Sequence, residues 1–459
     1  MKKYIVLAIV VVVIYFTQSF FLETGGVGAD SLSYFGIASD LPELKTNLFP
    51  LGYPVLIRIY HFIFQDYFWA GLMLDISFVV AILLFSCFRK FYFRETVLLF
   101  SGKTFFFTLN NIMSESAFVF LLYFLFYFFH QRLNGNIKSR NFIFFTSSLL
   151  ILMFTMRYSG IFIYLGVAVF WLMMVLKKKM FPAKADIFRV LLVSGIGIAV
   201  YLGFNYFFYG SFTGENLRGT RGQYYIVYIL RDILGVTNVV DPFILIKPAS
   251  NSWGSIGFQI VLMIFDLLLL RYFIRLVKKK KKSLQLQFHY LFWIIAGVYS
   301  IMLFVSGYFQ QIEEMDTRML AAANLCLFFS FLIIYFKDLK SDTVIFRLGC
   351  LSLLFLTMYN LKMPANYFRN RKQIEAQMPK FSSKKYLFND EREDQGNLTT
   401  YYIPVIKKTF QYRHTNNQKG TIKHSIAGTI NPQIKWLKYD TIKDKSQILY
   451  TSELVLKKE

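Results

Sequence analysis

The residues best suited to chemistry in this chain are ionisable side chains at the ends of long apolar runs. A carboxylate in such a place can accept a proton, and a guanidinium can bind a phosphate through parallel hydrogen bonds. Ionisable groups at membrane depth are costly and usually face a water-filled cavity or a partner. The group comprises Asp30, Arg58, His61, Glu115, Arg157, Arg218, Arg221, Glu313, Glu314, Asp316 and Arg318. We therefore expect a polar cavity at one side of a membrane.

Composition supports the membrane setting. Of the 459 residues, 55% are hydrophobic and 53 are Phe. Apolar runs long enough to cross a hydrocarbon core of about 30 Å recur up to residue 360, without the alternation of a β-barrel. The sequence predicts an all-α polytopic membrane protein with about 11 transmembrane helices in residues 1–360. The polar tail, 361–459, predicts a small α+β or β domain, with strands in "TTYYIPVI" and "SQILYTSELVL".

Charge patterning sets the expected orientation. The net charge is +24, and basic residues cluster in short runs between the apolar segments, which is typical of the positive-inside rule and not of nucleic-acid binding. With the first residues in the cytoplasm, the first outer loop is 23–66, the long outer loop is 209–254, and the tail lies outside a cell membrane. The expected spans are 4–22 (a retained helix, not a signal peptide), 67–88, 95–110, 116–130, 141–157, 160–176, 189–208, 255–277, 288–308, 319–336 and 345–360.

The first outer loop carries the strongest catalytic candidate. In "GGVGADSLSYFGIASDL", residues 25–41, Asp30 either caps a helix or serves as a proton acceptor, and the two roles are compatible. Tyr34 follows one helical turn later. In "NLFPLGYPVLIRIYHF", 47–62, the prolines and glycine are expected to break a helix, and an amphipathic helix on the membrane surface follows. Its candidate site residues are Tyr53, Arg58 and His61.

The other candidates each have a plainer structural explanation. Glu115 and Arg157 suit the dipoles of the helices that begin and end there, with Ser114 as a candidate cap. Arg218 and Arg221 lie in a glycine-rich loop that could present donors to a phosphate. Arg318 follows a cluster of acidic residues that could form internal salt bridges. The three cysteines lie in apolar runs and fit neither a disulfide framework nor a zinc site.

Four stretches together resemble the membrane glycosyltransferases of the GT-C fold, near the protein O-mannosyltransferase and aminoarabinose transferase group. They are "ADSLSYFGIA", "FPLGYPVLI", "MSESAFVFLL" and "MDTRMLAAANLCLFFSFL". The last has Met319 where the family commonly has Tyr. Many relatives also carry two adjacent acidic residues in the first outer loop, whereas Ser31 follows Asp30 here. This departure removes a metal role for an acidic pair.

The resemblance implies transfer of a sugar from a polyprenyl-phosphate carrier to a glycan, lipid or protein acceptor on the outer side of the membrane. Asp30 would take the proton of the acceptor hydroxyl in an inverting displacement, and arginines would stabilise the leaving phosphate. The expected arginines are Arg157, Arg218, Arg221 and Arg318. Neither a metal nor another cofactor is expected, because arginine can neutralise the phosphate.

Two other functions remain open at this point. A polysaccharide polymerase or ligase of the cell envelope would share the lipid-linked substrate, and the 209–254 loop with its two arginines is compatible with it. A transporter or flippase typically shows internal repeats and broken helices near the membrane centre. We find no repeat in this sequence.

Overall fold

The structure is a computed structural model of the chain. It describes residues 1–22, 25–42, 44, 46–176, 183–215, 233, 239, 243, 253–280, 284–309, 315, 317–338, 342–362, 364, 366–369, 385–389, 411–414 and 455–458.

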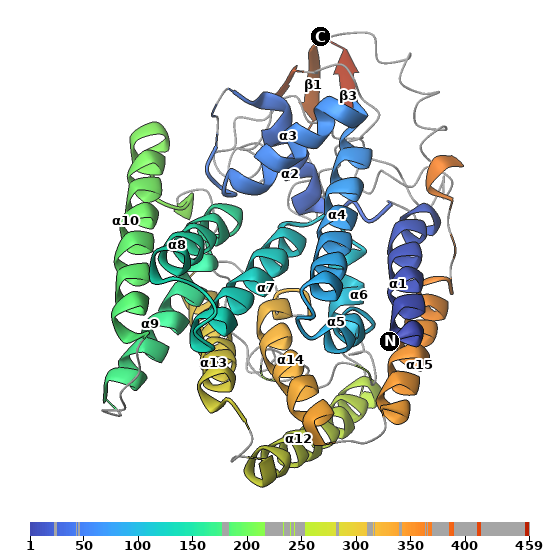
Figure 1. The fold of residues 1–459 in the computed structure, drawn as a ribbon. Helices are drawn as coiled ribbons and strands as arrows, with labels where there is room; N and C mark the ends of the chain where they lie inside the picture. Colours follow the sequence, from blue (N-terminus) through green and yellow to red (C-terminus); the bar gives the residue numbers. More distant parts are fainter. Residues whose placement is uncertain are drawn as a thin grey trace.

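Helices account for most of the described residues and pack into a bundle (Figure 1). Their bounds are α1 Lys2–Phe21, α2 Ala29–Asp40, α3 Gly52–Phe64, α4 Tyr67–Phe88, α5 Phe93–Phe100, α6 Lys103–Leu109, α7 Ser114–Leu133, α8 Ser139–Met156, α9 Gly160–Leu176, α10 Lys184–Tyr209, α12 Trp253–Lys280, α13 Leu286–Phe309, α14 Ala321–Asp338 and α15 Thr343–Asn360. Ten of the eleven expected spans correspond to single helices. Apolar runs of this length have few other ways to satisfy their backbone in lipid.

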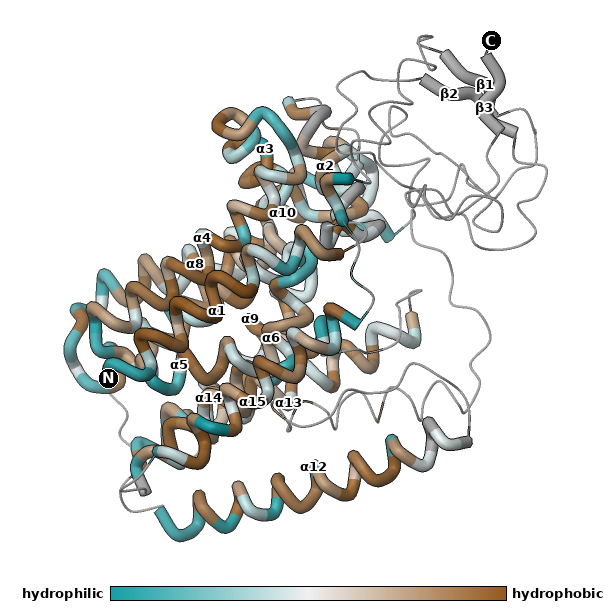
Figure 2. The backbone as a smooth tube through the Cα atoms, turned by 90° about the vertical axis from the view of Figure 1, so that its right-hand side faces the viewer, coloured by the Kyte–Doolittle hydropathy of each residue, from teal (hydrophilic) through white to brown (hydrophobic). Residues whose placement is uncertain are grey.

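Seven helices among the described residues are long and apolar enough to cross a membrane: α1, α4, α7, α8, α10, α13 and α15. The apolar helices α9 and α14 are slightly shorter. Large apolar side chains are exposed along the outside of the bundle, for example Val200 on α10 and Leu351 on α15. Brown, hydrophobic tube runs along α1, α4 and α8 in Figure 2. The coarse prediction of a helical, membrane-embedded chain is therefore supported.

The third expected span, 95–110, is not one helix. The chain forms α5 and α6, with a break at Ser101 and Gly102. The hydroxyl of Ser101 donates to the Leu98 carbonyl at 2.8 Å, and Gly102 adopts an extended conformation as it precedes α6. A serine that bonds back into its own helix, followed by a residue with extended backbone, ends α5 before α6 begins. The sequence did not indicate this break, because apolar residues continue on both sides of it.

Two helices, α2 and α3, fill most of the first expected outer loop. The prediction that Pro50, Gly52 and Pro54 break a helix is wrong for the last two, because α3 begins at Gly52 and includes Pro54. Proline is tolerated in the first helical turn, where its missing N–H would have no partner within the helix. Gly52 is required for packing, since a Cβ there would lie 2.6 Å from the carbonyl oxygen of Thr155.

The end of the chain contributes a small sheet. Strand β1 (Lys385–Asn389) pairs in parallel with β2 (Gln411–His414) and antiparallel with β3 (Val455–Lys458). The strand expected in "TTYYIPVI" lies outside the described residues, whereas β3 overlaps the end of the second expected strand. The domain boundary at 361 and the location of the tail remain predictions.

An ion pair fixes one end of the bundle. Asp186, in the first turn of α10, accepts from Arg132 at the end of α7 at 2.6 and 2.8 Å and from Ser139 at 2.5 Å. Asp186 is 4% exposed, and Arg132 is largely covered. Removing one member of such a pair leaves the other charge uncompensated in a water-poor site.

We expect Asp186→Ala to lower the free energy of unfolding in detergent by about 3 kcal/mol or more. The measurement is the midpoint of denaturant or thermal unfolding. Asp342→Asn is the matched control, because its partner Lys3 is 40% exposed and such pairs contribute about 1 kcal/mol or less. Equal losses in the two variants would contradict the assignment of Asp186 as a buried anchor.

Candidate functional site

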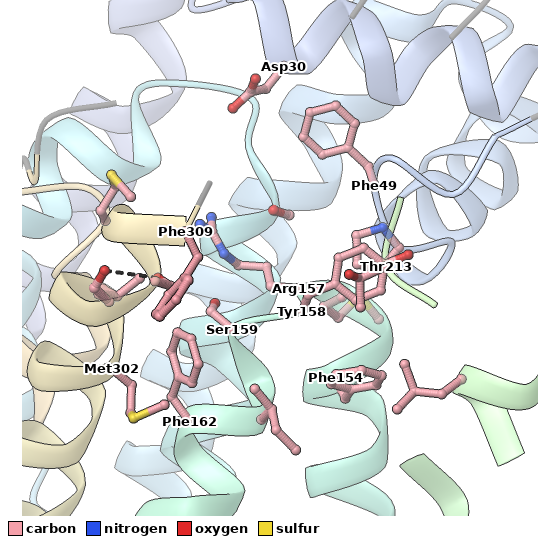
Figure 3. Close-up of a pocket in the computed structure, with 18 of the residues that line it drawn as sticks. Asp30, Phe49, Phe154, Arg157, Tyr158, Ser159, Phe162, Thr213, Met302 and Phe309 are labelled. Atoms are coloured by element: carbon pink, nitrogen blue, oxygen red, sulfur yellow. Dashed lines mark hydrogen bonds between the residues drawn. The ribbon is translucent and has the colours of Figure 1, made fainter. Parts of the chain in front are cut away.

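A cavity of about 540 Å³ lies among the ends of several helices. Its wall comes from α2, the segment before α3, the start of α7, the α8–α9 turn, α10 and the second half of α13. These segments are far apart in the sequence, so the cavity is a product of helix packing. Figure 3 shows the side chains that line it.

The cavity wall is divided between a polar and an apolar part. In Figure 3, Asp30 lies at one end, and the guanidinium of Arg157 extends toward that side. Tyr34 and Ser114 also line the wall, and their hydroxyls lie 2.9 Å apart. Phe162 and Met302 lie beyond Arg157 on the other side. The further apolar side chains in the wall are Phe49, Pro50, Phe154, Met156, Ile161, Leu202, Leu303, Val305, Phe309 and Met319, and the polar residues Tyr158, Ser159, Thr213 and Ser306 lie among them.

Glu115 is the centre of an ion network behind the polar wall. Its Oε1 lies 2.5 Å from Nη1 of Arg157 and 3.6 Å from Nε of Arg318. Nη1 of Arg318 in turn lies 3.7 Å from Oδ2 of Asp30. Two carboxylates and two guanidinium groups thus form one connected cluster. Glu115 is 5% exposed, whereas the side chain of Asp30 is 34% exposed toward the cavity.

Local structure explains how Asp30 reaches this position. The chain turns sharply at Gly26, whose φ is +82° and whose missing Cβ would lie 2.2 Å from the carbonyl oxygen of Asn110. The hydroxyl of Ser31 accepts from the Gly28 amide and donates to the Ile112 carbonyl. Both contacts fix the start of α2 against the segment that leads into α7, so Asp30 and Glu115 are held on adjacent elements.

Arg157 is positioned by the tight turn between α8 and α9. It is the residue that ends α8, and its amide donates to the Met153 carbonyl. Gly160 begins α9 so close to α8 that a Cβ there would lie 2.6 Å from the amide nitrogen of Phe154. The adjacent Tyr158 donates to the Asn47 carbonyl at 2.7 Å, which joins this turn to the segment before α3.

The expected capping roles are wrong in both cases. Gly28 precedes α2, and Asp30 lies in its first turn, where a negative charge still suits the helix dipole. Met113 precedes α7, and the Ser114 hydroxyl pairs with Tyr34 instead of capping the helix. Both polar groups therefore lie at the cavity wall with side-chain partners.

The surroundings of Arg157 and Tyr34 keep the arginine charged and the tyrosine neutral at the polar wall. Burial alone would lower the pKa of Arg157, but the neighbouring Glu115 carboxylate raises that pKa above its ordinary value. Arg157 therefore remains a cation. Burial, reinforced by Asp30 and Glu115, raises the pKa of the Tyr34 phenol, so that its O–H remains a hydrogen-bond donor.

Five expected site residues lie outside the cavity wall: Glu115 and Arg318 form the ion network behind it, and the other three belong to α3. Tyr53 is buried and donates to Asp75, although its ring packs edge-on against Tyr34. Arg58 donates to the Tyr67 hydroxyl at 3.1 Å, and the ring of His61 stacks on Tyr67. Arg58 and His61 thus belong to the surface of α3. Arg218 and Arg221, with Glu313, Glu314 and Asp316, lie outside the described residues.

Sequence reasoning missed the buried carboxylate Asp75 on α4. It is 2% exposed and accepts from Tyr53 at 2.9 Å and from Ser116 at 2.5 Å. Ser116 is in the first turn of α7, next to Glu115, so Asp75 helps to hold that turn against α3 and α4. The available signal was that Asp75 is the only charged residue in the apolar run 67–88.

Comparisons with known proteins give no relative for this chain. No protein-family model matches it, and neither the curated proteins nor the solved structures contain a significant match. A functional interpretation therefore depends on the residues themselves.

We expect Glu115→Gln to destabilise the protein by about 3 kcal/mol or more, because two guanidinium groups would lose their buried counter-ion. Thermal unfolding in detergent measures this. Ser306→Ala is the matched control: Ser306 lines the same cavity but bonds only within α13, to the Leu303 carbonyl, among the contacts of the described residues. It should change stability by about 0.5 kcal/mol or less. A neutral result for Glu115→Gln would contradict the central role of the ion network.

His61 gives a prediction about pH. Burial and the nearby Arg58 charge lower the pKa of His61 below its ordinary value of 6.5. The unfolded chain therefore binds more protons at this position than the folded chain below about pH 6.5, and stability should fall as the pH drops through that range. His61→Gln should make the decline shallower. An NMR titration that placed the His61 pKa above 6.5 would contradict this prediction.

Proposed function

We propose that this protein is a membrane glycosyltransferase that moves a sugar from a polyprenyl-phosphate carrier to a hydroxyl acceptor. The observation that carries the proposal is one cavity with Asp30 and Arg157 at its polar part and a mainly apolar wall beyond them. A lipid-linked sugar phosphate has the same order of parts: a hydroxylated sugar, an anionic phosphate and a hydrocarbon chain. The resemblance of four sequence stretches to GT-C enzymes agrees with this interpretation.

The apolar part of the cavity suits a donor that arrives from the bilayer. Val305 and Phe309, on the second half of α13, line the cavity and are 38% and 79% exposed. Exposed apolar side chains in the cavity wall would give a hydrocarbon chain a route along α13. A lipid donor would therefore reach Arg157 without transfer through water.

Asp30 is the proposed base. In the reaction, the acceptor oxygen forms a bond to the anomeric carbon while the bond between that carbon and the phosphate oxygen breaks. The electron pair leaves with the phosphate, and the acceptor proton passes to Asp30. Attack opposite the leaving group inverts the anomeric configuration. One positioned carboxylate is sufficient, because the phosphate leaves without protonation.

Arg157 and Arg318 are the proposed phosphate ligands. Arg157 lines the cavity, and Arg318 lies within 4 Å of both carboxylates. A phosphate that binds beside Arg157 would compete with Asp30 for the Arg318 guanidinium. Donor binding would thereby release the base from its ion pair, and the leaving phosphate would gain charge-assisted hydrogen bonds as its charge develops. The Tyr34–Ser114 hydroxyl pair is suited to contact the sugar.

We expect Asp30→Asn to lower transfer about 10²- to 10⁴-fold, the usual contribution of a positioned acid–base group. Mass spectrometry of envelope glycans and lipid-linked sugars would compare cells without the gene with cells that carry the wild-type or variant chain. The glycan lost without the gene should stay lost with Asp30→Asn and return with Asp342→Asn. Asp342 directly precedes α15 and does not line the cavity, so this variant makes the same charge change outside the site. Equal expression and unfolding midpoints would exclude misfolding. Full glycan recovery with Asp30→Asn would remove Asp30 from the mechanism.

One observation favours a second candidate, a flippase for a lipid-linked substrate. The break between α5 and α6 interrupts an apolar segment in the way that transporters often show. Proteoliposomes that contain the purified protein and a fluorescent polyprenyl-phosphate sugar would separate the two functions. Movement of the intact lipid between leaflets would support the flippase, and cleavage of the sugar–phosphate bond in the presence of acceptor would support the transferase.

A further inference from the structure

We propose that α3 lies in the membrane–water interface and is a lipid-binding surface of the protein. Its apolar face would enter the acyl chains, and Arg58 would contact the phosphates of anionic lipids. This proposal does not depend on the catalytic one, because it rests on residues outside the cavity wall.

The two faces of α3 are sharply different. Val55, Ile59, Phe62 and Ile63 follow the spacing of one helical face, and the last three are 50%, 71% and 70% exposed. On the other face, Tyr53 and Ile57 are fully buried. A helix of 13 residues is about 20 Å long and cannot cross a hydrocarbon core of about 30 Å. An exposed apolar face on so short a helix suits a position in the interface plane.

Neighbouring residues place α3 at interfacial depth. It joins α4 through the turn at Gln65 and Asp66, directly before Tyr67 and Trp69. At its other end, the Leu51 amide donates to Tyr201 on α10, just before the exposed aromatic residues Tyr206 and Phe207. Aromatic side chains concentrate where membrane-spanning helices reach the headgroups. Both ends of α3 therefore connect to aromatic ends of apolar helices.

Arg58 supplies the electrostatic part of the surface. Its guanidinium lies over the Phe62 ring at 5.2 Å and donates to the Tyr67 hydroxyl. Arginine commonly keeps its charged head at the headgroup level while its stem covers apolar surface. A cation held beside an exposed apolar face is complementary to an anionic lipid, whose phosphate and acyl chains lie in the same order.

The apolar helices next to α3 favour lipid over a protein as the partner of its exposed face. α3 packs on α4 and α8, both of which are apolar enough to span a membrane. Leu152 near the end of α8 and Val200 on α10 are also exposed. The apolar face of α3 thus extends a surface that the bilayer already covers.

The first experiment is a depth measurement in liposomes. A spin label on Phe62→Cys, with the three native cysteines replaced, would be tested for collision with oxygen and with a water-soluble nickel chelate. We expect oxygen contact as strong as at Val200→Cys and weak contact with nickel. Glu215→Cys, on an exposed polar residue, should show the reverse. Strong nickel contact at position 62 would overturn the proposal, as would protection from both reagents, which indicates a protein partner or a second copy.

A second experiment keeps the native cysteines, because Cys326 is buried and its replacement could impair folding. A photoreactive benzoylphenylalanine at position 62, in vesicles of equal phosphatidylglycerol and phosphatidylethanolamine, should give mainly lipid adducts, with phosphatidylglycerol enriched at least twofold. Arg58→Gln should return the adducts to the bulk ratio. Predominant protein adducts would overturn the lipid assignment, and enrichment that survives Arg58→Gln would remove Arg58 from it.

Discussion

The Glu115 carboxylate, held between two guanidinium groups, is the interaction on which the candidate site depends. A buried charge is tolerated only where opposite charges and hydrogen bonds compensate for lost water. Glu115 meets this requirement through Arg157 at 2.5 Å and Arg318 at 3.6 Å. The start of α7, the end of α8 and the segment before α14 must therefore meet at one point. The cavity lies where they do so.

The same constraint explains why the cavity has two distinct parts. Arg157 ends α8, so the side chains that precede and follow it come from apolar helices, and Phe154 and Phe162 continue the wall from the arginine. On the other side, Asp30 comes from a short helix fixed by Gly26 and Ser31 to the segment before α7. Charge and apolar surface are thus adjacent but supplied by different elements. A ligand must combine the two kinds of surface to fill the site.

Much of the helical fold could be predicted from the sequence, because apolar runs of fixed length are strong signals in lipid. The expected span 67–88 has the same bounds as α4, and 160–176 the same bounds as α9. The break at Ser101 and Gly102 was missed because apolar residues continue on both sides of it. Asp30, Glu115, Arg157 and Arg318 were found as separate signals. Their pairing was not predictable, since it depends on how α2, α7 and α8 pack, and the contribution of Asp75 depends on Tyr53 and Ser116 in other helices.

Arg58 and Arg157 show why residue type and hydropathy alone could not separate site from surface. Both arginines follow apolar residues and have aromatic neighbours. Arg157 ends a helix within the bundle, where its only route to a counter-ion among the described residues is across to Glu115, and it is 18% exposed. Arg58 lies in the 13-residue helix α3, which packs against the rest of the protein through one face only. Its guanidinium therefore rests on Phe62 at the protein surface. The distinction comes from the number of helices that surround each position. Both sites nevertheless connect through the segment before α3, because Pro50 lines the cavity and Gly52 contacts the end of α8. The proposed interfacial position of α3 would therefore be linked to the position of this part of the cavity wall.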